Sequence, residues 1–171
     1  MMKKVFLLSF IIILLVSGCA SGVNPTNENT IEVESEFCLL SDEETIELGM
    51  DISEVTMEPI STEQGSGDGF RWTINKYDNI EVKTLLTDDQ KNVINKASTE
   101  SPAYHTPRGI KPGDSVSKLK ETYPKHLAHS QSPEIEYYVF DPEDDIGFLR
   151  IYFYIEEDSV SRIVLENGID G

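Results

Sequence analysis

A chain of 171 residues with 14 Lys and Arg residues against 31 Asp and Glu residues carries a formal net charge of −17. Because binding to nucleic-acid phosphates needs a basic patch, this balance excludes nucleic acid as a partner, and it predicts repulsion from anionic lipid head groups. The acidic charge either keeps the chain soluble or presents an acidic face to a basic partner.

The N-terminus has the pattern of a secretory signal. Lys3 and Lys4 precede an apolar run of 12 residues, 5–16, which only Ser9 interrupts. A membrane-spanning helix needs about 20 apolar residues, whereas a signal peptide needs a basic start, an apolar stretch of about 7–15 residues and a small-residue cleavage site. The length therefore favours a signal peptide, over residues 1–18.

The end of this run, Val16-Ser17-Gly18-Cys19, resembles the lipobox of bacterial lipoprotein signal peptides. The resemblance implies diacylglycerol transfer to the Cys19 sulfur, cleavage between Gly18 and Cys19, and often acylation of the new N-terminus. Two or more acyl chains anchor a protein stably, where one chain binds only marginally. We therefore expect a lipid-anchored protein on the extracytoplasmic face of the cell membrane; the alternative is an ordinary signal peptide with an incidental cysteine.

The sequence after Cys19 divides into a tether and a folded part. Residues 19–35 are polar with few large apolar side chains, which predicts a flexible tether between the lipid and the domain. Cys38 then lies in an apolar, strand-like run at 36–40 that offers no base or cation to activate a thiolate. We expect Cys38 to be buried, and with Cys19 acylated no intramolecular disulfide is available.

Two similar blocks, 46–55 and 110–119, are separated by an offset of 64 residues. Each reads as a loop that enters a short helix, with Asp51 and Ser115 at the N-cap positions. The matched pairs are Ile46 and Ile110, Gly49 and Gly113, Ile52 and Val116, Ser53 and Ser117, and Val55 and Leu119. The repeat predicts two related units, at 36–104 and 105–171.

Strands are expected after each helix. Apolar or alternating runs predict them at 70–74, 80–86, 136–140, 148–155 and 160–166. The run 88–98 is ambiguous between a helix and a turn followed by a strand, and the repeat favours the strand. The predicted fold class is α+β: two tandem related units, each a short helical segment packed on an antiparallel sheet of about three strands. Residues 59–69 are expected to form a connection.

The repeated unit, I-x-x-G-x-x-(I/V)-S-x-(V/L) followed by antiparallel strands, resembles the β-lactamase-inhibitor-protein-like superfamily, which includes the SmpA/OmlA lipoprotein of outer-membrane assembly. The resemblance covers about residues 44–168 and implies a binding or scaffolding module. Inhibitor members hold a partner protein on the open face of the sheet. Here Tyr137, Tyr152, Tyr154 and Trp72 could lie on such a face, or they could pack under the helices.

No motif for catalysis or metal binding is complete. Ser115 in Gly-Asp-Ser lacks the downstream blocks of a serine esterase, and capping explains it. His126 and His129 would share a helix face and bind Zn²⁺ only if their segment were helical, whereas its flanks predict a solvated loop. The acidic run 141–145 lacks the calcium-loop framework, and 65–69 lacks the lysine of a phosphate loop. We predict no catalytic residue, no metal and no cofactor.

These features predict a membrane-anchored lipoprotein that acts as a protein-binding or scaffolding module of the cell envelope, with another envelope or secreted protein as its partner. An alternative is a surface hydrolase in which acids such as Asp141, Glu143, Asp144 and Asp145 do acid–base work. A third candidate, a solute-binding lipoprotein, is disfavoured by size, because clamshell binders close two lobes around a ligand.

Overall fold

The computed structural model describes residues 36–67, 69–142 and 148–168, so the predicted signal peptide 1–18, the tether 19–35 and Cys19 lie outside the described residues. The elements, in chain order, are β1 (Cys38–Leu40), β2 (Thr45–Glu47), the 3₁₀ turn η2 (Ile52–Glu54), β3 (Ser61–Gly67), β4 (Phe70–Lys76), β5 (Glu81–Leu86), β6 (Asn92–Thr99), α1 (Val116–Thr122), β7 (Leu127–Gln131), β8 (Glu136–Phe140), β9 (Leu149–Glu156) and β10 (Ser159–Asn167).

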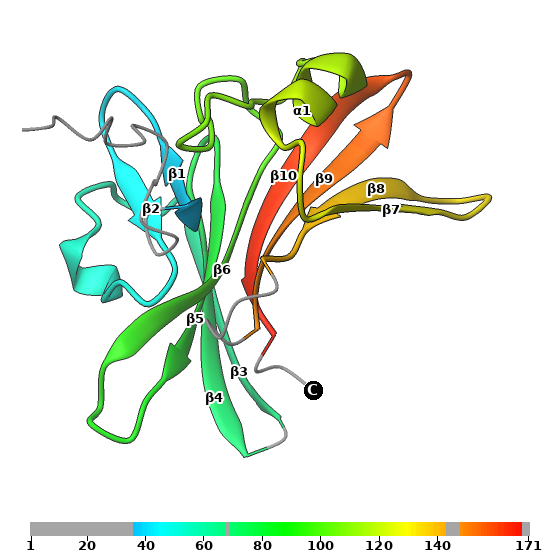
Figure 1. Cartoon of the computed structure of the whole chain (residues 1–171). Helices are drawn as coiled ribbons and strands as arrows, with labels where there is room; N and C mark the ends of the chain where they lie inside the picture. The colour runs from blue at the N-terminus through cyan, green and yellow to red at the C-terminus, as the bar shows by residue number, and fades with distance from the viewer. Residues whose placement is uncertain (1–35, 68, 143–147, 169–171) are drawn as a thin grey trace, which may run out of the picture.

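Eight of these strands form one antiparallel sheet in the order β3-β4-β5-β6-β10-β9-β8-β7. The strands β3–β6 and β7–β10 are two meanders, and their last strands, β6 and β10, pair with each other at the centre. The hairpin β1–β2 is separate from this sheet, and α1 lies over one end of β9 and β10 (Figure 1). The boundary predicted between 104 and 105 falls in the connection from β6 to α1.

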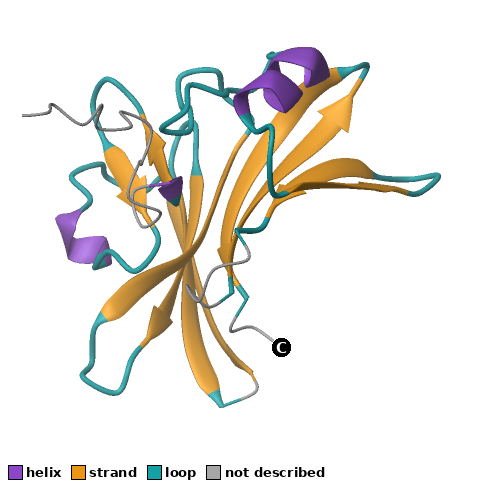
Figure 2. Ribbon diagram, in the orientation of Figure 1, coloured by secondary structure: helices purple, strands orange, loops and turns teal. Residues whose placement is uncertain are grey.

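The predicted α+β class is wrong, because the described chain is mostly β (Figure 2). In place of two units with about three strands each, one continuous sheet of eight strands runs through both halves. The first predicted helix is only the three-residue turn η2, which buries no side chain, whereas the seven-residue α1 buries Val116 and Leu119. Short helices depend on such packing for their stability. No described helix has the length and apolarity needed to cross a membrane.

The two matched blocks nevertheless have similar local structure. Gly49 and Gly113 have positive φ angles of 87° and 93°, a region that favours glycine. The Gly49 N–H donates to the Ile94 carbonyl on β6, and the Gly113 N–H donates to the Val160 carbonyl on β10. Each block thus pairs with the part of β6 or β10 that extends beyond the β6–β10 pairing. The strands that follow nevertheless form a single sheet.

The two N-caps are confirmed. The Asp51 carboxylate accepts the Ser53 N–H at 2.9 Å, and the Ser115 hydroxyl accepts the Lys118 N–H at 3.2 Å. Each cap satisfies a backbone donor that the first turn of a helix leaves without a partner. The turn predicted at 88–89 is also present and leads from β5 to β6, which is the strand predicted after it.

The hydrophobic core covers one face of the sheet. Alternating residues of β9 (Ile151, Phe153 and Ile155) point into it, as the sequence alternation predicted. Apolar side chains outside the sheet meet them from β1–β2, from the loop before α1 and from α1 itself; they include Phe37, Leu39, Ile46, Tyr104, Ile110, Val116, Leu119 and Tyr123. We call this side the covered face.

A buried ion pair fastens the start of the domain to the loop before α1. The side chain of Glu36 is 2% exposed, and both of its oxygens accept from Arg108 Nε, at 2.7 and 2.9 Å. The Arg108 guanidinium lies 4.6 Å from the centre of the Tyr123 ring and 5.2 Å from that of Phe140. Cys38, two residues after Glu36, is buried as predicted, and burial raises the pKa of its thiol to about 11.

Candidate functional site

The face of the sheet opposite the core is the candidate site, and we call it the open face. Residues directly opposite each other on neighbouring strands share a face, so the pairing registers define its members. They are Ser61, Glu63, Gly65 and Gly67 on β3; Phe70, Trp72, Ile74 and Lys76 on β4; Glu81, Lys83 and Leu85 on β5; Val93, Lys96 and Ser98 on β6; Arg162, Val164 and Glu166 on β10; Arg150, Tyr152, Tyr154 and Glu156 on β9; Tyr137 and Val139 on β8; and Ala128 and Ser130 on β7.

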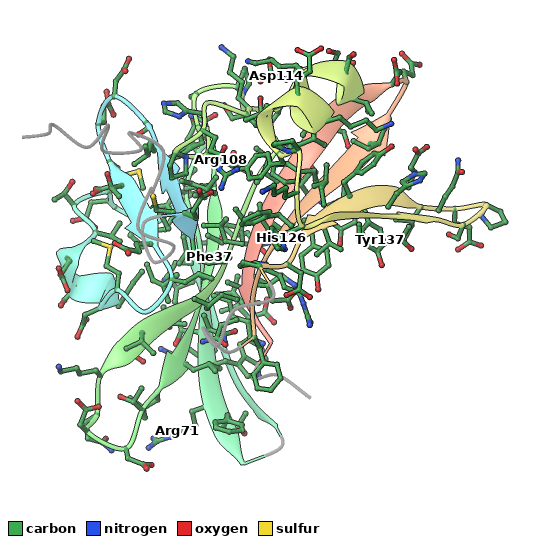
Figure 3. All side chains as sticks on the ribbon, viewed as in Figure 1. Phe37, Arg71, Arg108, Asp114, His126 and Tyr137 are labelled. Carbon is green, nitrogen blue, oxygen red and sulfur yellow. The ribbon has the colours of Figure 1, made fainter. Side chains whose placement is uncertain are left out.

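Three tyrosines form an aromatic cluster on the β8–β9 half of the open face. The ring of Tyr137 lies 5.8 Å from the rings of both Tyr152 and Tyr154, measured between centroids. Arg162 on β10 places its guanidinium 4.1 Å from the centre of the Tyr154 ring. All three tyrosines are partly exposed, and Figure 3 shows Tyr137 on the side of the β7–β8 hairpin away from α1. The sequence left open whether these tyrosines lie on an open face of the sheet or pack under the helices. In the structure they lie on the open face.

A second apolar cluster lies on the β3–β6 half, around Trp72. Trp72 is opposite Leu85, which is in turn opposite Val93, so the three side chains form a row across β4, β5 and β6. The indole extends over the edge strand β3, because a Cβ built on Gly65 would stand 2.1 Å from Trp72 Cζ2. The absence of a side chain at Gly65 therefore leaves the space that the indole occupies.

A band of charged side chains separates the two apolar clusters. Lys83 on β5 is opposite Lys96 on β6, and Lys96 is opposite Glu166 on β10, which is opposite Arg150 on β9. The Lys96 ammonium lies 3.1 Å from Glu166 Oε1, and Arg150 Nε donates to Asp141 Oδ2 at 3.0 Å. The open face thus combines two half-buried apolar patches with a polar centre.

The charge of the open face differs from that of the chain as a whole. Its five basic residues (Lys76, Lys83, Lys96, Arg150 and Arg162) nearly balance its four acidic residues (Glu63, Glu81, Glu156 and Glu166), whereas the chain carries −17. In contrast, the segment 36–60, which is not part of this face, contains many acids and no Lys or Arg. Interface centres are typically enriched in Tyr, Trp and Arg and depleted in Lys, Glu and Asp, so the two aromatic clusters, and not the charged band, have the composition of an interface centre.

The Gly-Asp-Ser segment is structural in this fold. Ser115 caps α1, as described above, and its hydroxyl has no histidine partner among the described residues. Asp114 accepts the Lys111 N–H and the Lys118 ammonium, both at 2.9 Å. Burial acts to raise the pKa of Asp114, but these two bonds prevail and hold it below its usual range. Neither side chain is arranged as a nucleophile with its base.

The segment with His126 and His129 is a strand, not the expected loop or a helix. His126 has a φ angle of 59° just before β7, and His129 lies within β7. The His129 ring stacks on Tyr138 at 4.4 Å, and its Nε2 lies 2.9 Å from Glu136 Oε1. Within the described part of the chain, no three His, Cys, Asp or Glu residues are grouped so that they could hold a metal ion.

The acids considered for a hydrolase are placed only in part. Asp141 accepts a hydrogen bond from Arg150, while Glu143, Asp144 and Asp145 lie outside the described residues. The predicted connection 59–69 contains the edge strand β3, so Gly65 and Gly67 belong to a hairpin with β4 and not to a phosphate loop. Comparisons of the chain with protein families, curated proteins and solved structures gave no match.

Proposed function

We propose that this protein is an extracytoplasmic lipoprotein, anchored at Cys19, that binds another envelope or secreted protein through the open face of its sheet. The single observation that carries this proposal is the composition of that face. Two partly exposed apolar clusters, centred on Trp72 and on Tyr152, flank a polar band in a region where the charges nearly balance.

Aromatic side chains are effective anchors for a partner protein. They bury a large area at low cost in side-chain entropy, and truncation of such a residue at an interface centre costs about 2 kcal/mol or more. Here the anchors are held in place before binding, because Tyr137 packs on Tyr152 and the Trp72 indole lies over Gly65. Such preorganisation reduces the entropy lost on association.

The acidic surface beyond the open face would act on the rate of association. Acids at the rim of an interface attract a basic partner over a distance and repel an acidic one, and salt weakens this effect. The segment 36–60 supplies acids such as Glu43 and Glu58, which are exposed on the other side of the sheet and so act on a partner through the long-range field of the protein and not by direct contact. The partner that fits has an apolar contact patch and a net positive charge.

The test is an in-cell crosslinking pull-down of the full chain, compared with four single variants. Cys19→Ala removes the acylation site, Trp72→Ala and Tyr152→Ala each remove an open-face anchor, and Ile60→Ala is the matched control. Ile60 is also a large apolar residue, 72% exposed, but it precedes β3 and is outside the open face.

One dominant partner that is captured by the parent chain and by Ile60→Ala, but is lost in the other three variants, would support the proposal. Capture that persists in Trp72→Ala and Tyr152→Ala would exclude the open face as the site. Capture unaffected by Cys19→Ala would contradict the role of the anchor. If no partner is enriched while the protein remains abundant at the membrane, the binding function itself is wrong.

A further inference from the structure

A second site lies on the covered face, where the loop after η2 passes over β3, β4 and β5. A cavity of about 360 Å³ opens there. We call this cavity the amide pocket. Its floor consists of uncharged polar side chains that point inward from the sheet, namely Thr62, Gln64, Thr73, Asn75, Thr84 and Asn92.

These residue types are unusual for the covered face of this sheet. In the other half, the inward positions of β8 and β9 hold Tyr138, Phe140 and Phe153, which pack into the core beneath α1. In the β3–β5 half the short turn η2 buries no side chain of its own. Polar residues at positions that normally bury apolar ones weaken the fold, and such departures from the pattern are expected at functional sites.

Asn75 is the strongest indication of a ligand. It is 7% exposed, and it lines the cavity. One end of its amide is paired, because Oδ1 accepts from the Thr62 hydroxyl at 2.9 Å. No hydrogen bond from its NH₂ group to a described residue is present, and this group is not enclosed, because the buried side-chain atoms without a partner in the described residues are Asn95 Oδ1 and the Tyr123 hydroxyl. Thr84 is fully buried beside it, and its hydroxyl reaches only the Thr73 carbonyl, at 3.5 Å. A ligand in the cavity that accepts from the Asn75 NH₂ group would replace water at this position.

The lining selects the chemistry of that ligand. Among the described residues that line it, Glu58 is the only charged one, and it is exposed, so these residues supply neither the cations that bind a phosphate nor the several carboxylates that bind a metal ion. Amides and hydroxyls can each donate and accept, which matches the vicinal hydroxyls of a sugar ring. Val55 and Met57 on the overlying loop give apolar contacts for the C–H groups of such a ring.

We propose that the amide pocket binds a neutral saccharide of one or two rings. A volume of about 360 Å³ is at the lower end of the range for small-molecule sites, which is about 300–1,000 Å³. The pocket and the open face are on opposite sides of the sheet, so this proposal does not rest on the proposed protein partner.

The experiment is an NMR titration of the full chain, labelled with ¹⁵N and held in a detergent that has no sugar head group. The probes are cellobiose and N,N′-diacetylchitobiose, which are neutral disaccharides with and without acetamido groups, and glucose 6-phosphate as the charged comparison. We expect at least one neutral probe to shift the side-chain NH₂ signals of Gln64, Asn75 and Asn92 in a saturable way. The indole N–H of Trp72, on the other face, should not shift.

Two pairs of variants locate the binding. Gln64→Ala and Asn75→Ala each remove a pocket amide, and Glu63→Ala and Lys76→Ala change the neighbouring residues whose side chains point to the opposite face. Loss of one hydrogen bond should weaken binding about threefold to tenfold. Gln64 is exposed, so its variant tests the pocket even if Asn75→Ala fails to fold.

Weaker binding in the first pair, with binding unchanged in the second pair, would support the proposal. It would be overturned if neither neutral disaccharide shifted the pocket signals, or if the shifts were equally strong in Gln64→Ala. Tighter binding of glucose 6-phosphate than of both neutral probes would also overturn it, because the pocket would then select charge. If another part of the chain occupied the pocket, neither neutral disaccharide would shift the pocket signals.

Discussion

The buried pair between Glu36 and Arg108 allows a quantitative prediction of stability. Replacement of Glu36 by Ala would leave the Arg108 guanidinium enclosed by Tyr123 and Phe140 without its carboxylate. Breaking a fully buried pair in this way costs about 3–5 kcal/mol. The side chain of Arg108 is 27% exposed, so water reaches part of it, and we expect a loss near the lower limit, about 3 kcal/mol.

The assay is urea unfolding of the parent chain and of the variants, with thermal unfolding as a second measurement. A loss of about 3 kcal/mol corresponds to a fall in Tm of about 6–12 °C for a domain of this size. Since the carboxylate is buried, the loss should depend little on salt concentration. The control is the double variant Glu36→Leu with Arg108→Met, which replaces both charges by apolar groups and should be more stable than Glu36→Ala alone.

A loss below about 1 kcal/mol in Glu36→Ala, the typical contribution of a surface pair, would refute this reasoning. It would mean that Arg108 turns to solvent when its partner is removed. A double variant no more stable than the single one would show that packing around Tyr123, and not the unpaired charge, carries the cost.

Three further predictions follow from single contacts. Because burial raises the pKa of Cys38 to about 11, its thiol should react with Ellman's reagent at pH 8 only as fast as the protein unfolds, and prompt reaction of the folded protein would contradict this. Gly65→Ala should displace the sole tryptophan, Trp72, from β3 and shift its fluorescence emission to longer wavelength; an unchanged spectrum would mean that the indole does not lie there. Desolvation acts to raise the pKa of Glu44, but bonds from the N–H and hydroxyl of Thr56 outweigh it and hold the pKa below its usual value, so this carboxylate stabilises the fold above about pH 4 and the stabilisation is lost as the pH falls through its folded pKa. Glu44→Gln should therefore reduce the dependence of urea stability on pH between about 3 and 5, and an equal dependence in both proteins would exclude Glu44 as its source.

Local patterns in the sequence were sufficient for several features. The alternation along 149–155 determined which side chains of β9 enter the core and which reach the open face, because successive residues of a strand point to opposite sides. Gly49 and Gly113 with the caps after them determined the two loop entries, because a positive φ and a capping oxygen act within a few residues. Such features depend only on neighbours in the chain.

Other features were decided only by the tertiary structure. The edge strands β3 and β7 consist mainly of exposed polar residues, so no apolar pattern marks them, and they exist because β4 and β8 offer backbone partners. The predicted fold class was wrong because nothing local specifies that β6 pairs with β10 and merges two meanders into one sheet. Glu36 and Arg108 are 72 residues apart, and Asn75 lines a pocket only because the loop after η2 lies over it. Contacts between distant segments are set by the balance of packing and hydrogen bonding over the whole chain, and the spacing of neighbouring residues does not encode them.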